Sequence, residues 1–295
     1  MLVIVGSVIV IVCVFGGYMG AGGHLEILWQ PFEVVIICGA ALGAYITANP
    51  KELLSQFAST PVMLLKGAKY NKESYLELLG LLFTIFKLAK SKGMLALETH
   101  VENPEESEIF QSFPGFMEDH HAVAFLCDYL RLFTLGTENA FELEALMDIE
   151  LETHHAEQAR LPDSIQTMAD GLPALGIVAA VLGVIHTMGL ISEPPEVLGV
   201  SIGGALVGTF LGVLVAYGFV APTASAVKNV IEADQKYYDC MKQGLIAYVQ
   251  GYAPAVSIEF ARKSLFSNVR PTFYEVEDAV ENLPTPGAAP PAASA

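Results

Sequence analysis

The basic residues of this 295-residue chain are confined to two stretches, and this distribution constrains its fold more than any other feature. All 15 Lys and Arg lie between Lys51 and Arg160 or between Lys228 and Arg270. Residues 1–50 and 161–227 contain none, and these two regions hold the longest uncharged apolar runs. A chain that is 53% hydrophobic and only 16% charged is typical of an integral membrane protein rather than of a soluble enzyme or a disordered chain.

Four uncharged apolar runs are long enough to cross a membrane, because a transmembrane helix needs about 20 apolar residues and at least roughly 17. The first run lacks the basic segment of a signal peptide, so we expect a retained helix. The second run is short, but its helix can begin among Leu28, Trp29 and Phe32, which suit the membrane interface. The runs are Met1–Leu25 with its apolar core at Leu2–Tyr18, Val34–Pro50, Gly171–Ser192 and Val197–Val227.

The charges between the runs predict the orientation. The connections within the two pairs of runs carry only acidic charges, on Glu26, Glu33, Glu193 and Glu196. Basic residues mark the cytoplasmic side, so both termini and the segment between the second and third runs are expected there. The predicted fold is an all-α polytopic membrane protein with four transmembrane helices and a cytoplasmic helical domain inserted between helices 2 and 3. Its expected parts are a transmembrane hairpin at 1–50, the cytoplasmic domain at 51–170, transmembrane helices 3 and 4 at 171–222, cytoplasmic C-terminal helices at 223–283 and a disordered Pro/Ala-rich tail at 284–295.

The cytoplasmic parts show helical patterns with recognisable ends. Tyr75–Lys90 has a wide apolar face and basic residues in its last turn, and Gly93 loosens or ends this helix. Gly136 stops another apolar helix, and Asn139 can cap the helix that follows it. The remaining expected helices are Ala122–Leu135, Ala140–Arg160, Ala224–Tyr252 and Ala255–Phe266.

The charge and the scarcity of reactive groups exclude several functions. The net charge of −17 is concentrated in the cytoplasmic parts, which argues against a nucleic-acid partner and favours a protein partner. We expect no Asp or Glu inside a span, so a partner must supply the acid if the chain moves ions. His186, toward the outer end of the third span, is expected to serve packing or the interface rather than proton transfer.

No metal, cofactor or enzyme motif is found in the sequence. Two histidine pairs occur, His120-His121 and His154-His155, and Glu150 lies one turn before His154. No further ligand accompanies them at suitable spacing, so we expect no metal site. The four cysteines are far apart and are expected to be apolar filler. Phosphate-binding loops, dinucleotide fingerprints and nucleophile elbows are absent, so an enzyme is not expected.

Small residues and two prolines mark the third and fourth spans. Glycines recur in both, which allows helix backbones to approach closely, either within one chain or in a ring of several copies. Pro173 and Pro222 lie near the expected cytoplasmic face, where each removes a helical hydrogen bond. The residues alone leave open whether these prolines are hinges or helix boundaries.

Several motifs resemble the MotA family of flagellar stator subunits over roughly residues 1–265. In the first hairpin the matching segments are Phe15-Gly16-Gly17-Tyr18 and Gln30-Pro31-Phe32-Glu33. In the third span the match is the segment from Asp170 to Gly183, with the sequence DGLPALGIVAAVLG. In the fourth span the matches run from Val207 to Gly212 and from Tyr217 to Pro222. The related TolQ and ExbB proteins share the ion-channel core but not this opening hairpin.

The resemblance implies a homo-oligomeric ring in the bacterial inner (plasma) membrane, expected to be a pentamer around a dimer of a MotB-like, peptidoglycan-anchored partner. The partner carries the ion-binding Asp, and ion flow drives torque on the rotor protein FliG. By the same resemblance Pro173 and Pro222 become functional residues of conformational coupling, Thr209 presents a hydroxyl to the ion path, and Lys90 and Glu98 contact the rotor.

The transported ion is expected to be a proton. Sodium-type relatives carry a Thr seven residues after the third-span proline, and this chain has Ala180 there, whose methyl group cannot ligate a cation. Three alternatives remain open: a sodium-driven stator, a TolQ/ExbB-like energiser of outer-membrane processes, and a membrane scaffold that conducts no ions.

Overall fold

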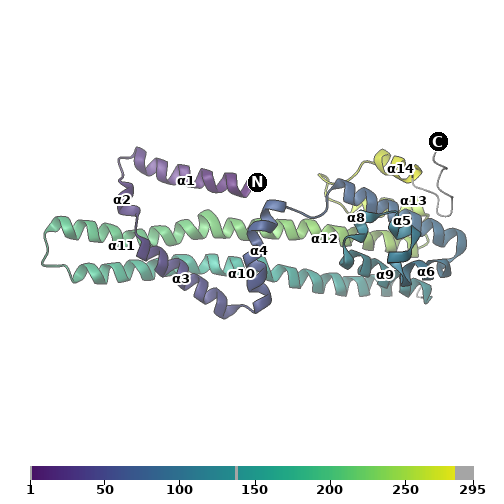
Figure 1. Ribbon diagram of the computed structural model, residues 1–295, viewed down its shortest axis with the longest axis horizontal. Coiled ribbons are helices and arrows are strands. Elements are labelled where there is room, and N and C mark those ends of the chain that lie inside the picture. Colours follow the sequence, from purple (N-terminus) through teal and green to yellow (C-terminus); the bar gives the residue numbers. More distant parts are fainter. Residues whose placement is uncertain (1, 137–138, 283–295) are drawn as a thin grey trace, which may run out of the picture. The chain divides into compact units, whose positions relative to one another are not determined.

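The computed structural model describes residues 2–136 and 139–282, and these residues form helices joined by short turns, without a β-strand among them (Figure 1). The expected disordered tail at 284–295 lies outside the described residues. Packing divides the chain into two compact units, one made of Met1–Gly67 with Ala156–Ile231 and the other of Ala68–His155 with Glu232–Ala295. The domain boundaries expected from the sequence follow membrane position rather than packing, so they stay a prediction.

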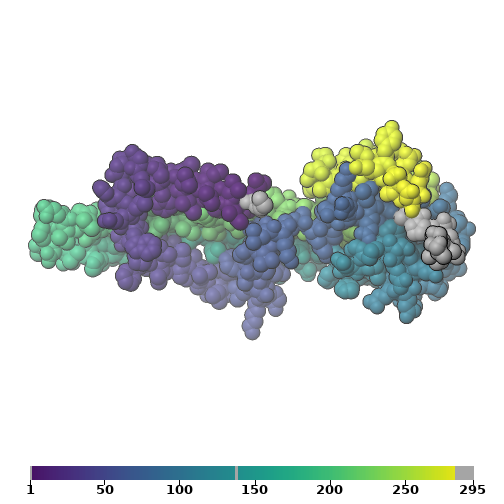
Figure 2. Space-filling view, turned by 45° about the horizontal axis from the view of Figure 1, so that its top comes forward, coloured from purple at the N-terminus to yellow at the C-terminus, as the bar shows by residue number. Residues whose placement is uncertain are grey.

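The first unit contains four helices that are long and apolar enough to span a membrane, which confirms the expected number of spans. α1 buries none of its residues within the chain, so its apolar surface is left for lipid or for another chain. In Figure 2 the purple N-terminal segment covers part of the green fourth-span segment, in agreement with the contacts of α2 and α3 with α11. The helices of this unit are α1 (Leu2–Gly20), α2 (Leu25–Leu28), α3 (Pro31–Ala48), α4 (Lys51–Lys66), the second part of α10 (Ala140–Met188), α11 (Pro195–Val215) and the start of α12 (Ala221–Val249).

α10 is one continuous helix of 49 residues, whereas the sequence predicted a cytoplasmic helix at Ala140–Arg160 and a separate transmembrane run at Gly171–Ser192. The reason is a helical stripe through that segment: Leu161, Ile165, Ala169 and Leu172 are all buried. Two of them pack with Leu53 and with the buried residues of α12. Burial of this stripe outweighs the local cost of the prolines inside the helix, because tertiary packing routinely overrides intrinsic propensity.

The second unit is built around α5 (Lys72–Lys92), which is buried on most of its circumference. Gly93 ends the helix as expected, with a φ of 87°, and at its start Asn71 and Ser74 form a reciprocal capping box that was not predicted from the sequence. Asn139 also caps as expected, since its side-chain oxygen accepts from the backbone N–H of Phe141 at 3.1 Å. The surrounding elements are η1 (Met94–Leu97), α6 (Glu98–Glu102), η2 (Pro104–Glu106), α7 (Glu108–Gln111), α8 (Pro114–Met117), α9 (His120–Thr134), the first part of α10, the rest of α12, α13 (Pro254–Lys263) and α14 (Phe273–Glu281).

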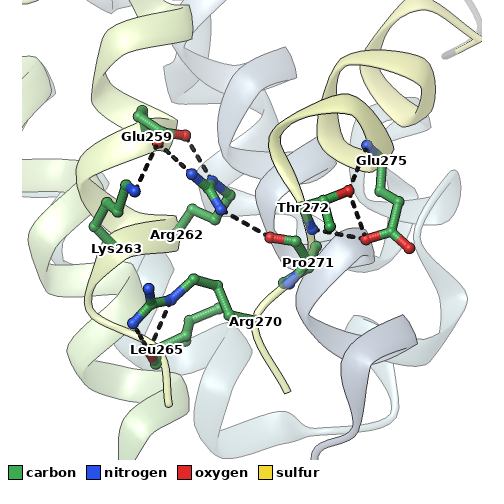
Figure 3. Close-up of polar contacts among 8 residues, drawn as sticks. All are labelled: Glu259, Arg262, Lys263, Leu265, Arg270, Pro271, Thr272 and Glu275. Carbon is green, nitrogen blue, oxygen red and sulfur yellow. Dashed lines mark hydrogen bonds and ion pairs between the residues drawn. The ribbon is translucent and has the colours of Figure 1, made fainter. Parts of the chain in front are cut away.

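The C-terminal helices α13 and α14 pack on α5, and Figure 2 shows the yellow C-terminal segment beside the blue segment of α5. The nearly buried Arg262 guanidinium donates both to the Glu259 carboxylate and, at 2.9 Å, to the carbonyl oxygen of Pro271 (Figure 3). At the start of α14, the Glu275 carboxylate accepts from Lys72 at 2.6 Å and from the backbone N–H of Thr272. These donors lower the pKa of Glu275 to about 2. Arg262 and Glu275 therefore fix the turn before α14 and attach that helix to α5.

We expect Arg262→Met to destabilise the second unit by about 2 kcal/mol or more, because it leaves the carbonyl of Pro271 without its donor and Glu259 without its main partner. Bonds from Arg262 lower the pKa of Glu259. The stability that the ionised Glu259 gives the folded state is therefore fully present above its unfolded pKa of about 4.3. This stability is lost as the pH falls through the lower pKa of the folded state. Thermal unfolding of the purified protein near pH 7 measures the loss.

Lys263→Met is the matched control, since Lys263 is largely exposed and its pair with Glu259 should contribute about 0–1 kcal/mol. Equal melting midpoints for the two variants would contradict this account.

Candidate functional site

Glycines bring the backbones of α10 and α11 into direct contact. A Cβ added at Gly176 would lie 2.8 Å from the carbonyl oxygen of Gly208, and one added at Gly212 would lie 2.8 Å from that of Leu172. At Gly183 a Cβ would meet the Cβ of Ala205 at 2.7 Å. These distances are too short for any larger side chain, so packing within one chain requires these glycines. Figure 1 shows α11 running beside this part of α10.

Ala180 and Thr209 lie at the level of this crossing. The backbone nitrogen of Ala180 is 2.9 Å from the position that a Cβ on Gly208 would take, and Thr209 follows Gly208 directly. The side chains of Ala180 and Thr209 are both half-buried within the chain. The structure therefore brings these two predicted residues of the ion path to one level.

Pro173 and Pro222 differ in their local structure. Pro173 is inside α10, which continues through it, and the neighbouring Leu172 is buried in the cluster that also contains Ala216. Pro222 is the second residue of α12, and this helix follows directly on a π-helical turn at Ala216–Val220. A proline ring clashes with the carbonyl four residues earlier and offers no N–H, and the wider π turn accommodates both effects. The residues alone left open whether Pro222 is a hinge or a helix boundary, and they did not predict this turn.

Glu33 corrects one prediction, because the sequence placed it in an outer connection and expected no carboxylate inside a span. The structure makes it the third residue of α3, inside the apolar segment Leu25–Ala48. The signal that could have shown this is Pro31, since proline is favoured at the first position of a helix. A helix that begins at Pro31 includes Glu33 in its first turn, and its side chain points to α10 and α11.

The two predicted rotor contacts lie in the second unit. Lys90 is exposed in the last turn of α5, and Glu98 is exposed at the first position of α6. Both charges are free to meet an external partner, and their role stays a prediction. The same unit has a cavity of about 670 Å³ lined by residues that include His154, His155 and Gln235. Within the described ranges no three His, Cys, Asp or Glu residues are arranged to hold a metal ion.

The sequence and the structure match characterised proteins along most of the chain. The profile of the motility protein A N-terminal family matches residues 4–93, and that of the MotA/TolQ/ExbB proton channel family matches residues 119–239. Motility protein A of Salmonella typhimurium and that of Escherichia coli are each 43% identical to the chain, over 97% of both sequences. Chemotaxis protein LafT of Vibrio parahaemolyticus is 37% identical, over 92% of this chain and 95% of its own length.

Two solved structures share the fold. The chain superposes on the C. jejuni MotAB structure with a TM-score of 0.72 at 20% identity, covering 90% of this chain and 96% of that one. It superposes on the flagellar MotAB stator complex of Bacillus subtilis with a TM-score of 0.66 at 23% identity, covering 87% and 92%. The fold expected from the sequence is therefore confirmed.

The helix crossing generates a prediction about glycine. We expect Gly212→Ala to separate α10 and α11, because the new methyl group would meet backbone atoms of Leu172 and Gly176 that cannot rotate away. The variant should lower both the thermal stability of the purified protein and motility. Gly199→Ala is the matched control on the same helix, because nothing lies within 4 Å of its Cβ position. Normal stability and normal swimming of Gly212→Ala would show that the crossing tolerates a wider separation.

Proposed function

Because this chain belongs to the motility protein A family, whose members are stator subunits of the flagellar motor, we propose that it conducts protons rather than sodium ions, together with a MotB-like partner. The resemblance stated from the sequence is confirmed. The family profile of the first hairpin, over residues 4–93, favours the stator over an energiser of the TolQ and ExbB type.

The observation that carries the proton proposal is the methyl group of Ala180 at the crossing of α10 and α11. The neighbouring Cβ position of Gly208 is surrounded by the backbone nitrogen of Ala180, the methyl of Ala179 and Oε2 of Glu33. A sodium ion needs several oxygen ligands to replace its hydration shell, whereas a proton needs only one acceptor at a time. At this level Thr209 supplies one hydroxyl and Glu33 one carboxyl group, and Ala180 adds no oxygen ligand where a sodium site would need one.

The partner and the assembly are inferred from the same surfaces. The solved relatives of this fold are described as MotAB complexes. We infer that a MotB-like subunit supplies an ion-binding Asp beside α10 and α11. α1 buries none of its residues within the chain, and α11 leaves several large apolar side chains exposed. These surfaces support a ring of several copies of this chain. We propose that the ring has five copies and surrounds a dimer of the partner.

The orientation and the rotor contact complete the proposal. We place both termini and the second compact unit in the cytoplasm of the cell and the 189–194 turn outside, because every basic residue then lies on the inner side. Lys90 and Glu98 are exposed on that unit and are proposed to contact the rotor protein FliG through charge. Exposed charge pairs contribute only about 0–1 kcal/mol each, so such a contact can form and break within each step.

Complementation tests the function and the ion together. The chain and its genomic partner are expressed in a strain that lacks its own stator. We expect swimming that stops with a proton uncoupler and continues after sodium is removed. Swimming that requires sodium would contradict the proton proposal, and failure to swim despite normal membrane levels of both subunits would contradict the stator function in that motor.

We expect Pro173→Ala and Pro222→Ala to reach normal membrane levels and to co-purify with the partner, but to give little or no swimming. Replacement restores a backbone donor and removes the local deformation, so the helix becomes straighter rather than less stable. Immunoblots and tracking of swimming cells measure the two effects. Pro61→Ala is the matched control, because Pro61 is also a helix-interior proline but lies in α4. Wild-type swimming of both variants, or their loss from the membrane, would refute a role in coupling.

A further inference from the structure

The carboxyl group of Glu33 lies in the membrane-spanning part of the chain with one oxygen fully buried and unpaired. Its Oε2 has no hydrogen-bond partner. The side chain reaches from α3 toward both helices of the crossing: Oε2 is 2.9 Å from the Cβ position of Gly208, and Oε1 is 3.5 Å from that of Gly183. The two glycines thus leave the space that this carboxyl group fills.

The neighbouring side chains of the same segment lie on the same face of α11. Ile27 contacts the Cβ position of Gly203 at 3.6 Å, and Gln30 approaches that of Gly204 at 2.9 Å. The Gln30 amide has a partner, because its Nε2 donates to the carbonyl oxygen of Ile27 at 3.3 Å. Glu33 continues this row by one turn, at Gly208, but has no equivalent bond.

Ordinary structural roles do not account for a carboxylate here. Residues 1–50 and 161–227 contain no Lys or Arg, so the segments around Glu33 offer it no basic partner. As the third residue of α3 it could accept from the first-turn N–H groups, yet Oε2 accepts no such bond. A neutral side chain would fill the same space without the cost of desolvating a charge.

The energetic cost points to a bound proton. A buried ionised carboxylate without a partner is strongly unfavourable, and inside a membrane such groups mark ion or proton pathways. Uptake from hydronium forms the O–H bond and releases one water molecule, and transfer to the next acceptor reverses this step. Gly208 joins Glu33 to the ion path, because its Cβ position is equally close to Oε2 and to the backbone nitrogen of Ala180.

We propose that Glu33 is a second proton-binding carboxyl group of the ion path, supplied by this chain in addition to the partner's acid. The inference rests on the proposed function and extends it. The carboxyl group belongs to the first turn of the helix that enters from the outer connection, so it receives protons from the outer side before they reach the partner. Titratable groups on its own helix and on the nearby ends of the elements packed around it include Cys38 in α3, Glu26 in α2, His186 in the last turns of α10 and Glu196 in the first turn of α11.

Three variants separate proton binding from shape. Glu33→Gln keeps the size of the side chain but cannot carry an exchanging proton, and Glu33→Asp keeps the acid. Glu26→Gln is the matched control, because Glu26 is an exposed acid on the same side of the hairpin. Uncoupler-sensitive proton influx is measured in cells that express the complex and is normalised to the amount that co-purifies with the partner.

We expect Glu33→Gln to lower the normalised influx by roughly tenfold or more, Glu33→Asp to retain a measurable part of it and Glu26→Gln to match wild type. Infrared spectroscopy of the purified complex, with the partner's acidic residue replaced by its amide, should show a deuterium-sensitive band of a protonated carboxyl group that disappears in Glu33→Gln. Wild-type influx in Glu33→Gln, or absence of the band, would overturn the inference while leaving the stator function intact. Absence of uncoupler-sensitive influx in wild type would overturn the proton proposal itself.

Discussion

Direct contact between the backbones of α10 and α11 is the constraint on which the rest of the membrane unit depends. Two glycines on each helix remove the side chains that would otherwise separate them, and the cluster of Leu172, Ala179 and Ala216 fills the space beside the crossing. In lipid there is no hydrophobic effect to hold helices together, so close van der Waals contact must supply the attraction. Thr209 lies beside this contact, and the Glu33 carboxyl group of α3 fills the space that Gly208 and Gly183 leave.

The segment that precedes α3 is shaped by the same glycine surface. Ile27, Gln30 and Glu33 follow one another along α11, each opposite a glycine. Further along, α3 packs through Ile37 and Ala41 into the cluster of Leu172, Ala179 and Ala216, and its Tyr45 hydroxyl lies 3.0 Å from that of Ser164. One continuous strip of small residues therefore fixes both the close helix pair and the entry of the second span.

Much of the fold could be predicted because its signals are local. Uncharged runs, basic stretches and the helix ends at Gly93 and Asn139 are readable in the chain itself, whereas the cap at Asn71 was recognised only once the start of α5 was known. The continuity of α10 could not be predicted, because it depends on burial of Leu161 and Ile165 against residues distant in sequence. Glu33 was missed because charge alone assigns it to a connection. Pro31 signals that the helix begins before Glu33, but the contacts of Glu33 with α10 and α11 depend on residues distant in sequence.

The π-helical turn before Pro222 affects the whole helix that follows it. A π turn holds one residue more than an α-helical turn, and each residue of an α-helix advances the chain by about 100° around the axis. The faces of α12 that bury Ala224, Val227 and Ile231 are therefore oriented by the presence of that extra residue. If the turn moved along the helix or was lost, every side chain it passed would rotate by about 100°. A small change in backbone hydrogen bonding at Ala216–Val220 would thus rotate the side chains beyond it about the helix axis by the angle of one residue.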